Sequence, residues 1–177
     1  MGIDPAYGSS AFGILVTQWA DGLVQLMHAE EYHRPDYNEM LSLVYGLISK
    51  YQIDKVYIDG AIPSFIKSLK LQIGEEADYE VIARYRSEEL RDATKDMKIV
   101  PVNFNKEHKA MVGHCKMLLQ RDGGRIAINP GKFDKLITAL RTAVDNDGTL
   151  DKEATSYNDR FDAFRLALKF YHYEEVS

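Results

Sequence analysis

Cysteine is almost absent from this sequence of 177 residues, in which Cys115 is the single one. One cysteine excludes an internal disulfide bond and a zinc cluster built on several cysteines. Cys115 lies in a helical pattern, where an inert buried thiol is more usual than a nucleophile. The chemistry of the chain therefore has to come from other side chains.

Long hydrophobic runs are also lacking. No apolar run approaches the roughly 20 residues that a membrane-spanning helix needs, and the N-terminus has neither a basic region nor an apolar signal core. The sequence contains no internal repeat, low-complexity tract or linker, yet 45% of its residues are hydrophobic. We therefore expect one soluble, intracellular domain over residues 1–177, with enough apolar material for a core.

Positive charge is in deficit, with 22 Lys and Arg against 27 Asp and Glu and a net charge of -5. This balance argues weakly against broad nucleic-acid affinity, because phosphate binding relies on Lys and Arg. It does not exclude a local basic groove. Carboxylates gathered around a metal would shift the count in the same direction.

The most informative stretch is residues 55–65, KVYIDGAIPSF. Its β-branched and aromatic residues predict a buried strand that ends at Asp59. Gly60 permits a sharp turn and Pro63 suits the first turn of a following helix. We expect Asp59 in the crevice beyond the carboxyl end of a sheet, where α/β proteins bind ligands. The alternative is that Asp59 simply begins a turn.

The segments before this stretch predict a strand, a hairpin and a helix. Residues 1–4 resemble the end of a strand whose beginning is missing, as in a domain excised from a longer chain. Asp21-Gly22 joins the apolar segments 11–19 and 23–30 in a predicted hairpin, and apolar residues at three- and four-residue steps predict a helix from Pro35 to Tyr51. In this order the strand that ends at Asp59 can lie parallel to the first.

The remaining segments alternate between strands and helices. Residues 72–96 are highly charged, and we assign them neither secondary structure nor a role. Pro101 indicates an edge strand or a kink, and Asn158 is the expected cap of the last helix. The predicted helices cover 62–71, 106–121, 133–144 and 159–173, and the predicted strands cover 97–104 and 125–128. The expected fold class is α/β, a mixed sheet with helices on both faces.

This order of elements brings several carboxylates together. Asp4 and Asp59 would end neighbouring parallel strands, and Asp159 and Asp162 share one face of the last helix. Asp159 alone is explained equally well as a negative charge at a helix N-terminus. Converging carboxylates repel one another unless a cation joins them, and oxygen ligands suit Mg²⁺ or Mn²⁺. Two such ions about 4 Å apart commonly hydrolyse phosphodiesters.

Five motifs resemble the nuclease domain of the large terminase subunit, the DNA-packaging motor of tailed viruses. They are GIDPAYG, VYIDG, NFNKEHK, GGRIAINP and SYNDRFDAFRLAL, and together they span nearly the whole chain. The last motif is the most specific, since terminases commonly show an acidic pair, two spacer residues, then Asp-Ala and an apolar helix. Here the pair is Asn158-Asp159, so an amide replaces the first acid.

The resemblance implies a ribonuclease H-like fold in which Asp4, Asp59 and Asp159 are catalytic and bind two divalent cations, Mg²⁺ or Mn²⁺. Asp162 would be an alternative or supporting metal ligand. The implied activity is endonucleolytic cleavage of double-stranded, concatemeric viral DNA at the initiation and termination of packaging, by two-metal-ion hydrolysis with little sequence preference.

The resemblance also implies partners: double-stranded DNA, the terminase ATPase domain, the portal protein and the small terminase subunit, in the cytoplasm of the host cell. Nothing in the sequence resembles a phosphate-binding P-loop, so we expect the ATPase domain to be absent. No membrane partner is expected.

Further residues are candidates for DNA contacts. Lys106 and Lys109 begin a helix near the strand ends and could contact phosphate, although exposed helix lysines are common. Arg160 adjoins Asp159 and could bind phosphate or neutralise the cluster. The histidines lack metal-ligand spacing, and His108 alone is placed to approach the cleft. Tyr7 and Ser9 could line a DNA groove.

Two other functions remain open on the sequence. Another ribonuclease H-like nuclease, such as a Holliday-junction resolvase, would show a fourth well-placed acidic residue and a preference for branched DNA. A degenerate domain that only docks on DNA or on a portal protein would bind DNA without binding metal. Asn158 keeps the second alternative open, and the three aspartates weigh against it.

Overall fold

The computed structural model of the chain describes residues 1–5, 11–73, 97–120 and 125–171. Tyr7, Ser9 and all but the first two residues of the charged segment 72–96 lie outside the described residues. Among the described residues, no helix is long and apolar enough to cross a membrane.

A six-stranded mixed sheet forms the centre of the fold. Its strand order is β5-β4-β1-β2-β3-β6. The strand β2 is antiparallel to its neighbours β1 and β3, and the other neighbouring strands pair in parallel. The strands are β1 (Gly2–Asp4), β2 (Ala11–Ala20), β3 (Leu23–His33), β4 (Lys55–Asp59), β5 (Lys98–Val102) and β6 (Ile126–Ala127). The expected parallel pairing of β1 and β4 is confirmed, and Pro101 lies on an edge strand as expected.

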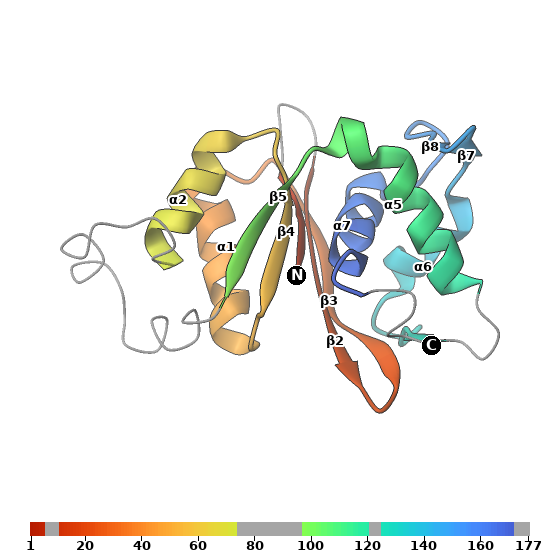
Figure 1. The fold of residues 1–177 in the computed structure, drawn as a ribbon, viewed down its shortest axis with the longest axis horizontal. Coiled ribbons are helices and arrows are strands. Elements are labelled where there is room, and N and C mark those ends of the chain that lie inside the picture. The colour runs from red at the N-terminus through yellow and green to blue at the C-terminus, as the bar shows by residue number, and fades with distance from the viewer. Residues whose placement is uncertain (6–10, 74–96, 121–124, 172–177) are drawn as a thin grey trace.

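Helices cover both faces of this sheet, as predicted. One face carries α1 (Tyr37–Lys50) and α2 (Pro63–Ile73), and the other carries α5 (Phe104–Leu119), α6 (Asp134–Thr142) and α7 (Asn158–Leu168) (Figure 1). Each face has its own apolar core. Val44 and Phe65 belong to the core under α1 and α2, whereas Leu118, Leu136 and Phe164 belong to the core between α5, α6 and α7.

Local sequence chemistry explains the first hairpin and the first helix. Asp21 and Gly22 both have positive φ, at 55° and 74°, which suits a two-residue hairpin turn. The helix α1 begins at Tyr37 and not at Pro35, because Asp36 is its N-cap. The Asp36 carboxylate accepts the Glu39 N–H while the Glu39 side chain accepts the Asp36 N–H, so both orphan donors are satisfied.

A second, smaller hairpin was not predicted. Its strands are β7 (Asp145–Asn146) and β8 (Thr149–Leu150), in a segment where the sequence analysis predicts no strand. Asp147 and Gly148 have positive φ, at 55° and 83°, so this turn repeats the Asp-Gly chemistry of the first hairpin. Each strand has only two residues, too few to give an alternating pattern.

The helix α7 differs from its prediction at both ends. It stops at Leu168, short of the expected residue 173, and Asn158 does not cap it. The N-cap position is Tyr157, which has φ of 53° and gives no side-chain cap. The Asn158 amide instead donates to the carbonyl oxygen of Lys152, 3.1 Å away. Its side chain is therefore used to hold the loop before the helix.

Two glycines let α7 pack directly on the sheet. A Cβ atom at Gly13 would overlap the carbonyl oxygen of Asp159, and one at Gly2 would overlap that of Ala163. The obstacle in both cases is backbone, which has little freedom to move. The absence of side chains at Gly2 and Gly13 therefore brings the first turns of α7 against β1 and β2.

We predict that Gly13→Ala lowers the free energy of unfolding by roughly 1–3 kcal/mol, because the methyl group forces α7 away from β2. Gly46→Ala on the exposed side of α1 is the matched control, since nothing lies within 4 Å of its added Cβ. That variant should be stabilised by up to about 1 kcal/mol through helix propensity. Urea unfolding measures both, and equal effects would contradict the close contact at Gly13.

Candidate active site

The carboxyl end of the central strands carries a row of acidic residues. Ile3 pairs with Ile58 in the parallel ladder, so the next residues, Asp4 and Asp59, lie side by side. Asp4 pairs with Gly13 on its other side, and Gly13 pairs with Glu31. The first turn of α7 lies over Gly13. The fold therefore places Asp159 over Gly13, the position between Asp4 and Glu31 that has no side chain.

Asp4 lies deepest of the three expected ligands, with 8% of its surface exposed. Burial raises its pKa well above the ordinary range, and the charges of Asp162, Asp159 and Asp59 raise it further. The positive charge of Lys152 opposes them. Asp4 therefore lies near enough to Asp59, Asp159 and Asp162 for their charges to act on it.

Asp59 is half-buried at the end of β4. The Ala61 N–H donates to its Oδ1 at 3.3 Å, so Asp59 does begin a turn as well as ending the strand. Burial raises the pKa of Asp59, and this hydrogen bond counteracts part of the effect. The two interpretations of Asp59 are therefore compatible, since the turn fixes the carboxylate at the strand end.

Asp159 is half-buried in the first turn of α7. Burial raises its pKa, whereas Lys152 and the backbone N–H of Ala11 lower it, and Asp162 and Glu31 raise it. Glu31 is an acidic neighbour that the sequence analysis missed. It also lines a separate groove with Tyr32 and α1, and the alternating pattern of β3 gave no reason to single it out.

Asp162 is fully buried and lies between two cations. Its Oδ1 contacts the Arg165 guanidinium, and its Oδ2 is 2.8 Å from Lys152 Nζ. Arg165 is itself fully buried, with its guanidinium carbon 4.3 Å from the centre of the Phe104 ring. Asp162 thus joins the core of the domain to the acidic row.

A cleft of about 670 Å³ opens beside these groups. Asp59 and Lys152 line it, together with Asn103, Phe104 and His108 from the segment that begins α5. The approach of His108 to the cleft is as expected. Lys152, which follows the unpredicted hairpin β7–β8, was missed because its place depends on that hairpin.

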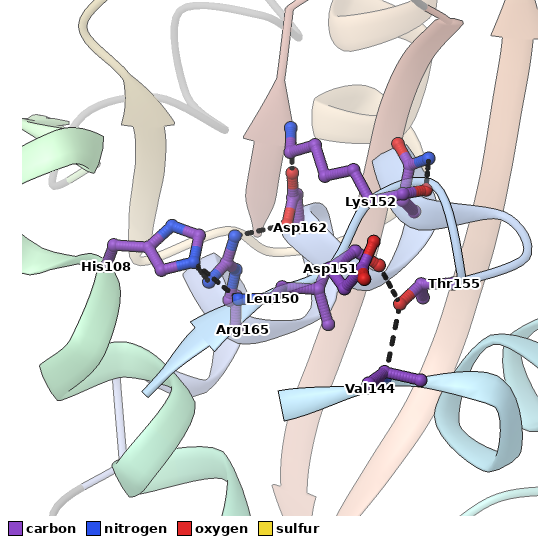
Figure 2. Close-up of polar contacts among 9 residues, drawn as sticks. His108, Val144, Leu150, Asp151, Lys152, Thr155, Asp162 and Arg165 are labelled. Atoms are coloured by element: carbon purple, nitrogen blue, oxygen red, sulfur yellow. Dashed lines mark hydrogen bonds and ion pairs between the residues drawn. The ribbon is translucent and has the colours of Figure 1, made fainter. Parts of the chain in front are cut away.

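The His108 ring is oriented by its Nε2 atom, which accepts the Leu150 N–H at 2.9 Å and lies 3.4 Å from Arg165 Nη1 (Figure 2). Two donors facing one nitrogen require that nitrogen to be unprotonated. Burial and the Arg165 charge also lower the pKa of His108. The ring is therefore neutral with its proton on Nδ1, which makes no hydrogen bond within the described residues.

The candidate DNA-binding residues lie away from this cleft. Lys106 and Lys109 are exposed on α5, and the Lys109 side chain packs against Gly148 of the second hairpin. Arg160 is buried and pairs with Glu30 on β3 at 3.3 Å. None of these three side chains lines the cleft, so their contacts with DNA stay a prediction.

The donor set fits a divalent cation in chemistry and charge. Asp4, Asp59 and Asp159 offer only oxygen atoms, the ligands that Mg²⁺ and Mn²⁺ prefer. Burial and the neighbouring carboxylates raise their pKa values, and a bound cation would offset this effect. As placed, no three acidic, His or Cys side chains of the described ranges are close enough to hold a metal ion.

We predict that Arg165→Met lowers the free energy of unfolding by about 3–5 kcal/mol, because it leaves the buried Asp162 charge without its inner partner. Arg160→Met is the matched control. Its guanidinium is equally buried, but its partner Glu30 is half-exposed and stays hydrated. Chemical denaturation should show a much smaller loss for the control, and similar losses would contradict this account of Asp162.

We also predict that NMR finds the His108 proton on Nδ1 at neutral pH. Long-range ¹H–¹⁵N spectra of the imidazole rings distinguish the two nitrogens, and the exposed His33 provides the reference for a solvated ring. A proton on Nε2, or a doubly protonated ring, would contradict the two hydrogen bonds assigned to that atom.

Comparisons with known proteins identify the family and the fold of the chain. Residues 1–169 match the family model described as the Terminase RNaseH-like domain. A crystal structure of the g2p (large terminase) nuclease domain from bacteriophage SPP1 with bound Mn is similar, with a TM-score of 0.60 and 14% sequence identity over 96% of this chain and 84% of that chain. No curated protein sequence matches. The expected ribonuclease H-like fold is confirmed, and the chain belongs to the Terminase RNaseH-like domain family.

Proposed function

We propose that this chain is a single-domain, divalent-metal-dependent endonuclease that cleaves double-stranded, concatemeric viral DNA when genome packaging starts and ends. The observation that carries the proposal is the convergence of Asp4, Asp59 and Asp159 at one edge of the sheet, where each has a raised pKa. The similar SPP1 nuclease domain was solved with bound Mn, which supports metal use.

Asp4, Asp59 and Asp159 would hold two Mg²⁺ or Mn²⁺ ions. When bound, these cations would activate a water molecule and stabilise the leaving oxygen of the phosphodiester. Asp4 and Asp59 belong to paired strands, so the sheet fixes their spacing. The Ala61 N–H orients Asp59, and the Ala11 N–H orients Asp159. Strand pairing and these two hydrogen bonds thus set where the carboxylates lie.

The cleft beside Asp59 would receive the DNA backbone. The Nδ1–H of His108 is a neutral donor for a phosphate oxygen, and the Lys152 ammonium attracts the phosphate charge. Phe104 packs edge-on against the His108 ring, with centroids 5.6 Å apart, and helps to fix it. Lys106 and Lys109 would contact the duplex farther from the scissile bond.

We propose the cellular setting by analogy with the family. A terminase nuclease domain would work beside the ATPase domain, the portal protein and the small terminase subunit, in the host-cell cytoplasm. Family membership supports this setting without identifying the surfaces that meet these partners.

The position of Glu31 is a reason to test one alternative function, that of a Holliday-junction resolvase. It extends the acidic row beyond Gly13 and acts on the pKa of Asp159, so it is a further acid of the kind expected in a junction resolvase. The terminase family match favours linear duplex DNA. A comparison of cleavage rates on a four-way junction and on a linear duplex of the same sequence distinguishes the two functions.

We predict that the purified chain nicks and linearises supercoiled plasmid with Mn²⁺ or Mg²⁺ and that EDTA stops the reaction. Asp59→Ala should lower the rate by at least about a hundredfold, because one ligand of the reacting centre is lost. Asp54→Asn is the control, because Asp54 is exposed and directly precedes β4, at the end of the strand away from Asp59, and it should cut normally. A folded wild type that binds DNA but cuts with neither metal would overturn the nuclease proposal in favour of a docking domain.

A further inference from the structure

Lys152 is the cation that contacts the aspartate cluster from the side of the cleft. Its Nζ lies 2.8 Å from Asp162 Oδ2, and its charge also acts on Asp4, Asp59 and Asp159. About half of its side chain is exposed, at 52%, whereas Asp162 is fully buried. The ammonium therefore sits at the boundary between the carboxylates and the open cleft.

The loop that carries Lys152 is held on both sides. Before it, the Leu150 N–H is bonded to His108. The N–H groups of the two residues after it, Glu153 and Ala154, donate to the Asp151 Oδ1 atom, both at 3.1 Å. Figure 2 shows the Lys152 side chain extending from this loop to the Asp162 carboxylate.

Asn158 adds a third support and accounts for the unusual amide in the last motif. Its Nδ2 donates to the Lys152 carbonyl oxygen at 3.1 Å. An aspartate at this position would face that carbonyl with an acceptor and repel it. An amide is therefore the side chain that can join the start of α7 to the backbone of Lys152.

These contacts hold the Lys152 ammonium beside the aspartates, in the region where a divalent cation would have to bind. The oxygen that the ammonium contacts, Asp162 Oδ2, belongs to the supporting ligand candidate, so a divalent cation bound through that oxygen would have to displace the ammonium. Because the Lys152 stem is flexible and half-exposed, the ammonium can turn from Asp162 into the cleft without moving its backbone.

Resting on the function proposed above, we propose that Lys152 is the built-in counter-ion of the metal site. In the metal-free protein its ammonium neutralises the carboxylates, and divalent cations bind by displacing it toward the cleft. The intrinsic affinity of the carboxylates for metal is therefore greater than the affinity that the intact protein displays.

The test is a titration of the full chain with Mn²⁺ alone, followed by calorimetry and by the EPR signal of free Mn²⁺. Lys152→Met should bind Mn²⁺ about tenfold more tightly than the wild type, because no ion pair has to be broken. Lys152→Arg keeps the charge and should bind no more tightly than the wild type. Lys98→Met, at the far end of edge strand β5, removes the same charge elsewhere and should have no effect.

Thermal unfolding provides a second readout. In EDTA, Lys152→Met should unfold at a lower temperature than the wild type, since its carboxylates repel one another without a counter-ion, and Mn²⁺ should raise its Tm by more. Asn158→Ala keeps the lysine but removes its backbone support, so its Mn²⁺ affinity should rise by a smaller factor. This variant tests the proposal even if Lys152→Met does not fold.

Unchanged or weaker Mn²⁺ binding by folded Lys152→Met, or by folded Asn158→Ala if the first variant does not fold, would overturn the assignment of Lys152. If Asp59→Ala still abolishes binding in that case, the proposed metal site stands and only the role of Lys152 fails. If neither the wild type nor the Lys152 variants bind Mn²⁺, the proposed function and this inference fail together.

Discussion

Repulsion between neighbouring carboxylates is the constraint on which this structure depends. The charge of Asp162 raises the pKa values of Asp4, Asp59 and Asp159, and both Asp4 and Asp162 are buried. Such a cluster survives folding because Arg165 meets it from the core and Lys152 meets it from the cleft. A domain that kept the acids and lost both cations would be strongly destabilised, because buried carboxylates would have no partner.

The same cluster exists only because α7 reaches the sheet. Gly2 and Gly13 remove the side chains that would separate them, so the helix that carries Asp159 and Asp162 lies directly on the strand that carries Asp4. Strand pairing provides the other half, since the register of β1 and β4 sets Asp4 beside Asp59. The close packing of α7 on the sheet therefore also brings the charges of Asp159 and Asp162 toward Asp4.

Much of this arrangement could be predicted from local patterns. Alternation, Asp-Gly turns and helical periodicity gave the sheet, its parallel pair and the helices, and the ends of two strands gave Asp4 and Asp59. The cations were harder to predict. Lys152 follows a hairpin of two-residue strands that has no periodicity, and Arg165 looks like one more polar residue of an apolar helix until Asp162 is known to be buried beside it. Asn158 was taken for a cap because its partner, the Lys152 carbonyl, belongs to that same unpredicted loop.

The short hairpin β7–β8 has a consequence for how such domains can vary. Leu150 holds His108 through its backbone, and Lys152 follows two positions later. One inserted residue between them would move the lysine by about 3 Å and turn it to the opposite side of the chain. Insertions at the tip, beyond Asn146 and Thr149, would leave both contacts in place. The hairpin can therefore lengthen at its tip, while the length of its base is fixed by the contacts of Leu150 and Lys152.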